Sequence, residues 1–358
     1  MVHTTKMRGR MFKRLWIVSA ISVFLLVAYS SIVLVPAKEN PLEVGWLKDV
    51  HWTPGTLKVG IYDFLINPSD ACKLGSRDMT LLLLVKSAPS NKPRRDVIRE
   101  TYVSGIKELN LPARVLFVMG NLEDSMERES IREEADLHGD ILQADFKDHY
   151  YNLTIKLITG FKWVANFCRN TEFVMSIDDD VMLDIVTLVQ DLEGLPSWNR
   201  TNLCLGEPNV GKPIRNEDSK WYCPKELYPE DTYPLSPFGA GYVLSQDSVQ
   251  KLYVASKVVL PKVPFDDVYC GMLLDATGIA IADRVKLYAK LHPDRKPKDY
   301  LKSQLSVHQM TKAWDNWEDF KDVSERENHR TKRAKLFIFP FLLVLLLCMF
   351  FICTIVHC

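Results

Sequence analysis

Three consecutive acids end a short apolar stretch near the middle of the chain: Asp178, Asp179 and Asp180 follow Phe173–Ile177. Adjacent carboxylates repel one another, so three of them at the end of a buried strand need a cation or solvent to offset their charge. Alternate side chains of an extended segment point the same way, which would let Asp178 and Asp180 face one ligand. Their hard oxygens suit Mg or Mn, which keep positions open for diphosphate oxygens. The alternative is an exposed turn, or the N-cap of a helix expected over Met182–Leu192.

A second acidic pair, Asp266 and Asp267, precedes apolar residues whose spacing predicts a helix. Two neighbouring carboxylates disfavour joint ionisation, so one of them can hold a pKa high enough to take a proton from a hydroxyl. The alternative is that acids in a first helical turn only complement the helix dipole. Upstream, Gly239 and Gly241 precede the strand-like segment 242–245. Their missing side chains would let a ligand or another backbone approach closely, although a tight turn would use them equally well.

The elements that must position these acids are short apolar runs alternating with helix-like segments. Runs at 79–85 and 114–119 predict buried strands, and the segments between and after them have helical spacing, so the pattern indicates an α/β fold. Leu153, Leu157 and Phe161 recur every four residues and predict a helix packed under the sheet. In an open parallel sheet, ligands bind at the carboxyl ends of the strands, which places the acid triplet at the rim of a crevice.

The composition excludes two broad classes of protein. The 45 Lys and Arg residues equal the 45 Asp and Glu residues in number, so no general charge attracts nucleic acid, and we expect no nucleic-acid partner. The chain is 47% hydrophobic and 25% charged, which is the composition of a protein with a packed core and not of a disordered one.

Two uncharged apolar runs, 15–35 and 336–356, are each long enough to cross a bilayer as a helix. Five cations and no acid lie in residues 1–14 before the first run, which predicts a cytosolic tail, a signal-anchor helix and type II topology. A cleaved signal peptide is the alternative for the first run, and a lipid-anchor signal for the second, which we expect to be a second membrane helix. Contact with membrane lipid follows from either span.

The anchors divide the rest of the chain into a stem over 36–77, a catalytic domain over 78–320 and a basic linker over 321–335. Five cysteines lie between the apolar runs without a CxxC pair, so disulfides are a better interpretation than zinc, with one thiol left over and the connectivity open. Glycosylation sequons at Asn152 and Asn199 agree with a lumenal location.

Eight motifs follow one another along the chain: Arg94–Tyr102, Val115–Gly120, Gly139–Trp163, Phe173–Val181, Lys220–Tyr222 with Tyr228 and Pro229, Pro234–Ser245, Phe265–Gly271 and Ser306–Gln309. Taken together, they resemble the β1,3-galactosyltransferase and β1,3-N-acetylglucosaminyltransferase family of brainiac-like inverting glycosyltransferases. The resemblance covers about residues 79 to 317. Two positions differ from many members, which have Trp where this chain has Tyr102 and Glu where it has Asp266.

The resemblance implies a GT-A fold, with an open, mixed but mostly parallel sheet flanked by helices, a UDP-sugar donor and Mn²⁺. It also implies a role for each acid. Asp180 would be the main metal carboxylate and His308 the second metal ligand; Asp178 and Asp179 would assist at the nucleotide; Asp267 would be the catalytic base, with Asp266 beside it. The cations Arg94, Arg95 and Arg99 are candidates for offsetting the donor phosphates, with a solvated helix face as the alternative. Trp221 and Tyr222 offer flat faces for sugar stacking, unless they belong to the core.

The function expected from this resemblance is that of a Golgi membrane enzyme with its catalytic domain in the lumen, with one or two membrane spans. It would move galactose from UDP-galactose to the 3-hydroxyl of an acceptor glycan, in β linkage and with inversion, on a glycolipid or glycoprotein. The alternatives are transfer of N-acetylglucosamine or N-acetylgalactosamine, a non-catalytic sugar-binding protein on the same fold, and a metal-dependent hydrolase.

Overall fold

The structure, a computed structural model, describes residues 59–73, 79–291, 293–294 and 300–315. The predicted cytosolic tail, both predicted membrane spans and the basic linker lie outside these residues. Within the described ranges, no helix is both long and apolar enough to cross a membrane.

An eight-stranded sheet forms the centre of the folded unit. Parallel pairings join β4 to β3, β3 to β2 and β2 to β5, whereas β10 runs antiparallel to both β5 and β7. The sheet is therefore mixed, with a parallel half that carries the predicted acid triplet. In spatial order the strands are β1 (Phe64–Ile66), β4 (Ile141–Lys147), β3 (Ala113–Asn121), β2 (Met79–Lys86), β5 (Thr171–Asp178), β10 (Gly241–Ser245), β7 (Cys204–Gly206) and β11 (Ile281–Asp283).

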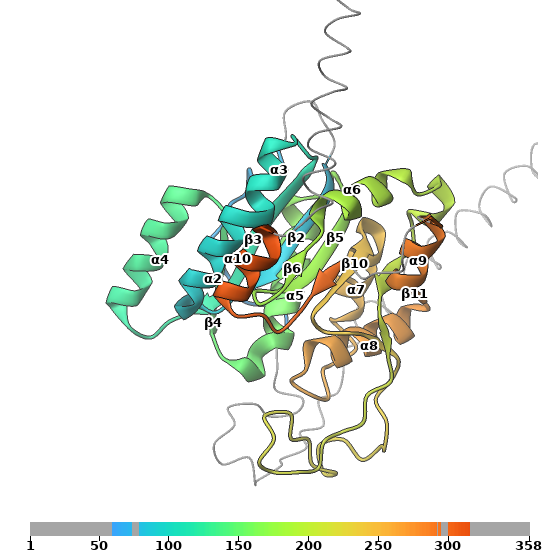
Figure 1. The fold of residues 1–358 in the computed structure, drawn as a ribbon. Coiled ribbons are helices and arrows are strands. Elements are labelled where there is room, and N and C mark those ends of the chain that lie inside the picture. The colour runs from blue at the N-terminus through green and yellow to red at the C-terminus, as the bar shows by residue number, and fades with distance from the viewer. Residues whose placement is uncertain (1–58, 74–78, 292, 295–299, 316–358) are drawn as a thin grey trace, which may run out of the picture. The chain divides into compact units, whose positions relative to one another are not determined.

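Helices cover both faces of this sheet, as Figure 1 shows, with α10 lying beside α2. The helices whose residues pack on one face are α2 (Lys92–Ile98), α3 (Ser104–Glu108), α4 (Ser125–His138), α6 (Ile185–Gly194) and α10 (Val307–Asp315). Those on the other face are α5 (Leu153–Phe167), α7 (Gln246–Ala255) and α8 (Asp266–Thr277). A π-type turn (Arg99–Val103) joins α2 to α3, α9 (Arg284–Leu291) follows β11, and short 3-10 turns lie at Pro89–Asn91, Tyr150–Asn152 and Ser197–Asn199.

The two-sided cover explains why β2 is apolar without alternation. Leu81 and Leu83 belong to the core on the α2 side, while Leu82 and Leu84 belong to the core on the α5 side. Since successive side chains of a strand point to opposite faces, a strand buried on both faces must be apolar throughout. The strands predicted from the apolar runs are confirmed as β2, β3, β5 and β10.

The predicted start of one helix is wrong. The helix expected over Met182–Leu192 starts later, as α6 at Ile185, because Met182–Leu183 forms the strand β6 instead. This strand pairs with β12 (Leu301–Lys302), a distant segment that no local pattern reveals. The N-cap of α6 is Asp184, whose side chain accepts a hydrogen bond from Thr187, so the acid triplet is not a helix cap.

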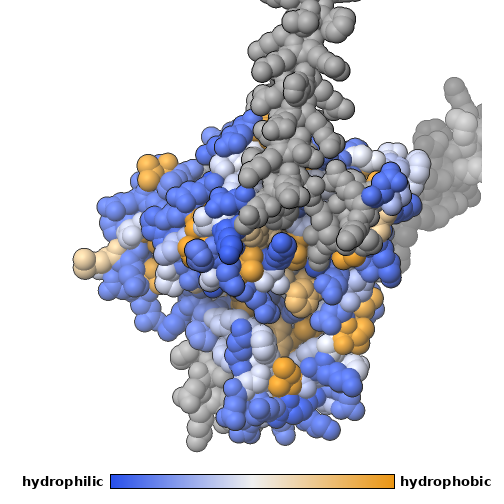
Figure 2. Space-filling model, viewed as in Figure 1, coloured by the Kyte–Doolittle hydropathy of each residue, from blue (hydrophilic) through white to orange (hydrophobic). Residues whose placement is uncertain are grey.

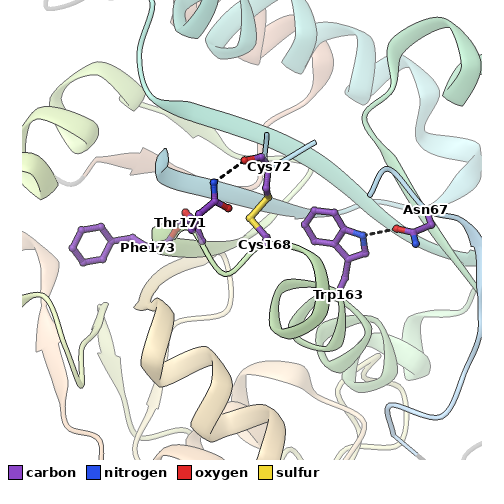
Figure 3. Close-up of a disulfide and its surroundings, with 7 residues drawn as sticks. Asn67, Cys72, Trp163, Cys168, Thr171 and Phe173 are labelled. Carbon is purple, nitrogen blue, oxygen red and sulfur yellow. Dashed lines mark hydrogen bonds between the residues drawn. A yellow bond between two sulfur atoms is a disulfide. The ribbon is translucent and has the colours of Figure 1, made fainter. Parts of the chain in front are cut away.

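The described part of the predicted stem, residues 59–73, packs onto the sheet. Strand β1 pairs with β4, and Cys72 forms a disulfide with Cys168 at the end of α5 (Figure 3). Nearby, the Trp163 indole donates a hydrogen bond of 2.8 Å to Asn67. The folded unit therefore begins no later than residue 59, and not at residue 78.

Five cysteines could form two disulfides, but the described residues contain one. Cys204, Cys223 and Cys270 are free and buried. Free cysteine behaves as a small apolar residue in a core, which accounts for these three positions without a second bridge.

The surface drawn in Figure 2 is mostly hydrophilic, with apolar residues scattered between polar ones. Exposed apolar side chains such as Met126, Trp198 and Val258 come from separate segments of the described chain. Isolated exposed apolar residues are ordinary on soluble surfaces. The search for a site therefore turns to the cavity that the acids line.

We expect Cys72→Ser to lower the free energy of unfolding by about 2–4 kcal/mol, because the bridge closes a loop of 96 residues in the unfolded chain. Urea unfolding of the full chain in detergent measures this loss. The double variant Cys72→Ser/Cys168→Ser should lose no more than either single variant. A loss equal to the sum of the two would show that the cysteines act separately.

Candidate active site

A cavity of about 550 Å³ lies at the carboxyl ends of β2 and β5, and all five predicted acids line it. The register of the sheet brings them together. Lys86, the last residue of β2, pairs with Asp178 at the end of β5. Gly241 at the start of β10 pairs with Ile177, which places the turn at Gly239 beside the acid triplet. Two acidic groups almost ninety positions apart in the sequence therefore share one cavity.

A buried lysine joins the two groups. The Lys86 ammonium lies 3.0 Å from the Asp178 carboxylate and 2.5 Å from that of Asp266, and only 3% of its side chain is exposed. It also donates to the Gly239 carbonyl at 3.3 Å. Burial by itself lowers the pKa of Lys86, but the two carboxylates raise it above its usual value, so the ammonium stays charged. Lys86 thus offsets one acid of each group.

Asp266 and Asp267 have different environments, which decides the choice that the sequence left open. Asp266 is buried against Lys86. Asp267 accepts a hydrogen bond from the Val268 amide through Oδ1, while its Oδ2 accepts none from the described residues. A Cβ atom at Gly239 would lie 3.1 Å from that Oδ2, so the glycine leaves room for it. Asp267 is therefore the carboxylate available to a ligand.

The environment of Asp267 suits proton transfer. Burial, and next the negative charge of Asp266, raise the pKa of Asp267 to about 6. Burial likewise raises the pKa of Asp178 to about 6, against the opposing charge of Lys86, even though 40% of that side chain is open to the cavity. A carboxylate with a pKa of about 6 is largely ionised at neutral pH and is a stronger base than an ordinary aspartate.

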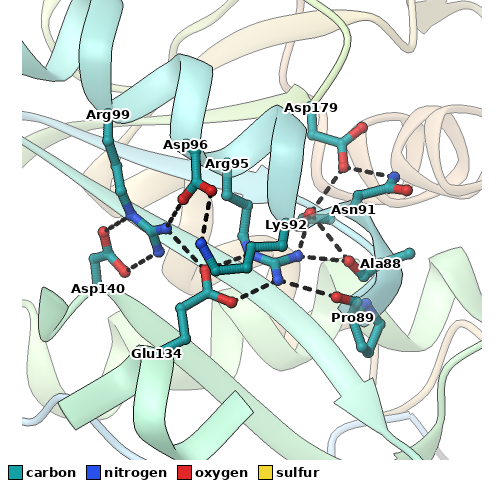
Figure 4. Close-up of polar contacts among 11 residues, drawn as sticks. Ala88, Pro89, Asn91, Lys92, Arg95, Asp96, Arg99, Glu134, Asp140 and Asp179 are labelled. Atoms are coloured by element: carbon teal, nitrogen blue, oxygen red, sulfur yellow. Dashed lines mark hydrogen bonds and ion pairs between the residues drawn. The ribbon is translucent and has the colours of Figure 1, made fainter. Parts of the chain in front are cut away.

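Asp179 braces the loop between β2 and α2. Its buried carboxylate accepts hydrogen bonds of 2.8 Å from Ser87, Asn91 and Arg94. Figure 4 shows the contact with Asn91. The expected alternation of Asp178 and Asp180 does not hold, because β5 ends at Asp178 and the chain turns at the next two residues. Protein cations already pair with the carboxylates of Asp178 and Asp179. The contacts of these two acids with a nucleotide remain predictions.

Two of the three predicted phosphate-binding arginines do not line the cavity. Arg95 is fully buried and forms two hydrogen bonds with Glu134, and Arg99 contacts Glu134 and Asp140 (Figure 4). These acids lie on α4 and just before β4, where the local pattern around the arginines could not reveal them. Arg94 alone of the three lines the cavity.

Asp180 is the triplet member whose carboxylate has the most distant cationic partner. Its charged neighbour is the Arg94 guanidinium at 3.8 Å, and it accepts no side-chain hydrogen bond from the described residues. A partly exposed carboxylate facing a cavity is the donor type that Mg²⁺ or Mn²⁺ prefers, so this residue fits the ion that the resemblance implies. In the described part of the chain, no group of three His, Cys, Asp or Glu side chains is arranged to hold a metal. Substrate oxygens would have to complete such a site.

His308 has a different setting from the one expected. It is exposed near the start of α10 and does not line the cavity. The motif around it is a capping box, in which the Ser306 hydroxyl accepts from the Gln309 amide and the Gln309 side chain accepts from the Ser306 amide. The sequence Ser-Val-His-Gln therefore has a structural role in starting α10, and the metal ligation of His308 remains a prediction.

Of the two aromatic residues predicted to stack on a sugar, one lines the cavity and the other does not. Trp221 lines the cavity with 45% of its surface exposed, and the Lys220 ammonium lies 4.4 Å from its ring. Tyr222 does not line the cavity. Trp221 thus offers a flat apolar face beside the acids, as a sugar-stacking residue would.

Sequence reasoning missed the internal cations of the site. Lys86 ends its apolar run as Asp178 ends the neighbouring one, so the rule that placed the acids at the rim would also have found it. Lys156 on α5 pairs with Asp148 at 2.9 Å and donates to the Ser87 carbonyl at 2.7 Å. Lys156 thereby holds the same loop, between β2 and α2, that Asp179 contacts. No local signal distinguishes this lysine from a surface one.

Comparisons with known proteins agree on one family. The galactosyltransferase family model matches residues 93–285. The chain is 38% identical over 239 residues to lactosylceramide 1,3-N-acetyl-beta-D-glucosaminyltransferase A of Danio rerio, which covers 64% of this chain and 62% of that protein. The Homo sapiens protein named lactosylceramide 1,3-N-acetyl-beta-D-glucosaminyltransferase is 33% identical over 270 residues, covering 73% of this chain and 70% of its own length. Less than two thirds of the Danio rerio relative is thus matched.

A solved structure described as the apo form of the WbbM bifunctional glycosyltransferase covers 71% of this chain and 52% of its own. Its sequence identity is 10% and its TM-score is 0.37.

We expect Lys86→Met to lower the free energy of unfolding by about 3 kcal/mol at pH 8, because it leaves two facing carboxylates without their cation. The positive charge of Lys86 also lowers the pKa values of Asp178 and Asp267. Without Lys86, these folded-state pKa values should rise further above the unfolded value of about 4. Protonation then favours the folded variant, so its deficit should shrink as the pH falls towards 5. Urea unfolding at both pH values measures this change.

The matched control is Lys92→Met, which removes an exposed ion pair with Asp96 one helical turn away. It should change stability by less than about 0.5 kcal/mol at either pH. Equal losses in the two variants, or a Lys86→Met deficit that grows at low pH, would contradict the role given to Lys86.

Proposed function

Because the chain belongs to the galactosyltransferase family, we propose that it is a β1,3-glycosyltransferase that moves N-acetylglucosamine from its UDP donor to a glycolipid. The acceptor would be the 3-hydroxyl of a terminal sugar, as on lactosylceramide. The observation that carries the proposal is the single cavity in which an available carboxylate, Asp267, lies together with the acid triplet.

The choice of sugar rests on the relatives. Their names specify transfer of N-acetylglucosamine to lactosylceramide, which favours this donor over the galactose expected from the sequence. The family description alone does not separate the two sugars, since the family that the motifs resemble includes both kinds of transferase. The same names favour a glycolipid over a glycoprotein acceptor.

In the proposed reaction, the acceptor oxygen bonds to the anomeric carbon of the donor sugar as the bond from that carbon to UDP breaks. The hydroxyl proton passes to Oδ2 of Asp267, and UDP leaves with the electron pair. Attack from the face opposite UDP inverts the anomeric centre, as in other single displacements at sugars. Burial and the charge of Asp266 keep the pKa of Asp267 raised, while Lys86 holds Asp266 in place. The Trp221 face would orient a sugar ring beside them.

A divalent cation held at Asp180 would offset the negative charge on the leaving diphosphate. Arg94 lines the same side of the cavity and supplies a fixed positive charge there. The chain itself therefore provides one cationic group for the donor in addition to any bound ion.

We place this reaction in the lumen of the Golgi, with the chain anchored in the membrane by the apolar run at 15–35. The disulfide between Cys72 and Cys168 supports an oxidising compartment, because such bridges are rare in the cytosol. A glycolipid acceptor also requires an enzyme held close to a membrane.

The donor choice is tested with full-length protein in detergent, Mn²⁺, lactosylceramide and a panel of UDP-sugars. We expect UDP release and extension of the glycolipid with UDP-N-acetylglucosamine, at a rate at least about tenfold above that with UDP-galactose. The reason is that a pocket whose polar groups bind the acetamido group leaves those groups unpaired when the sugar lacks it. Preference for galactose would restore the first expectation. UDP release without acceptor would instead indicate a hydrolase.

We expect Asp267→Asn to lose transfer while keeping affinity for the UDP-sugar, because the amide cannot take the hydroxyl proton. In the unaltered protein, kcat/KM should fall about tenfold per pH unit below about pH 6, as protonation of Asp267 removes the base. Initial rates from pH 4.5 to 8 measure this dependence. Retained transfer in Asp267→Asn, or a flat profile down to pH 5, would exclude Asp267 as the base.

A further inference from the structure

Gln304 has a backbone conformation that glutamine rarely adopts. Its φ is +60°, in the left-handed region, which costs every residue with a Cβ atom some stability. The other described non-glycine residues with positive φ are Asn110 and Asn202, and asparagine tolerates this region through local hydrogen bonds. Glutamine has no such compensation. A residue that stays strained where glycine would be relaxed suggests that its side chain has a use.

The turn at Gln304 connects β12 to α10 beside the acid triplet. The next residue, Leu305, donates its backbone amide to the Asp180 carbonyl at 3.0 Å. Strand β12 itself pairs with β6, which starts two positions after Asp180. The backbone around Gln304 is therefore fixed against the residue that fits a divalent cation.

Gln304 lies where a donor would bind. Gln304 is exposed and lines both the main cavity and an adjoining groove. Four other residues line both spaces: Arg94, Asp180, Lys220 and Trp221. The side-chain amide of Gln304 makes no hydrogen bond with any described residue. An amide supplies two N–H donors, and here it lies among two cations and one carboxylate.

We propose that the Gln304 amide donates a hydrogen bond to a diphosphate oxygen of the sugar nucleotide, and that the strained turn is kept because it aims this amide. The inference rests on the proposed function for the identity of the ligand. It assigns Gln304 to the donor and not to the acceptor, because its neighbours Arg94 and Asp180 form the cationic, metal-fitting side of the cavity.

The test uses two variants of the full-length protein, with donor affinity measured by calorimetry with UDP-N-acetylglucosamine and Mn²⁺. Gln304→Gly removes the amide and relaxes the backbone, so the melting temperature should rise by about 2 °C while Kd increases about tenfold. Gln304→Glu keeps the shape and the strain but replaces the N–H donors with a negative charge. Its Kd should increase by at least as much, with the melting temperature unchanged.

The control is Asn202→Gly, which alters a left-handed residue that does not line the cavity. It should leave Kd within about twofold of the unaltered protein. The acceptor KM should stay within about twofold in all three variants.

The two Gln304 variants must agree. Unchanged Kd in both would overturn the inference, and so would a loss in Gln304→Glu alone, which reports only added charge, or in Gln304→Gly alone, which reports only added flexibility. If the unaltered protein binds the UDP-sugar but transfers nothing to lactosylceramide, the proposed function fails, while the binding measurements still decide the role of Gln304.

Discussion

The site depends on one buried ammonium between two carboxylates. Lys86 contacts Asp178 from the strand beside it and Asp266 from the start of α8, so a single charge ties the sheet to the helix that carries Asp267. A buried ion pair adds little net stability but is costly to break, which makes it a strong constraint on geometry. The separation between the acid triplet and the pair Asp266 and Asp267 is thereby fixed through Lys86 and not through the loops alone.

Much of this arrangement follows from local sequence. Apolar runs located β2, β3, β5 and β10, and the rule that ligands bind at the carboxyl ends of parallel strands correctly placed the acid triplet at the rim of a cavity. Short runs of this kind are readable because burial on both faces of a sheet demands apolar side chains throughout. The pair Asp266 and Asp267 also opens a helix, as its position before an apolar period predicts.

What the sequence did not reveal depends on partners far along the chain. Met182 lies in a strand because β12 reaches it from more than a hundred residues away. Arg95 and Arg99 form ion pairs with acids on other elements, so these cations of the basic helix start are not available to a ligand. His308 is a different case, because it stands in a capping box that the local Ser-x-x-Gln spacing is enough to indicate. The first two cases are tertiary constraints that override local preference.

The distribution of charge within the cavity separates structural from functional acids. Asp178, Asp179 and Asp266 each have a cationic partner within 3.0 Å, whereas Asp180 and Asp267 have no such partner among the described residues. A carboxylate in a cavity without a close cationic partner costs stability, and proteins accept such a cost mainly at functional sites. We therefore expect ligand charge to meet these two acids: under the proposed function, Asp180 would hold a cation beside the diphosphate and Asp267 would take a hydroxyl proton. The same reasoning extends to Gln304 beside Asp180, because its backbone is strained and its side-chain amide makes no hydrogen bond with a described residue.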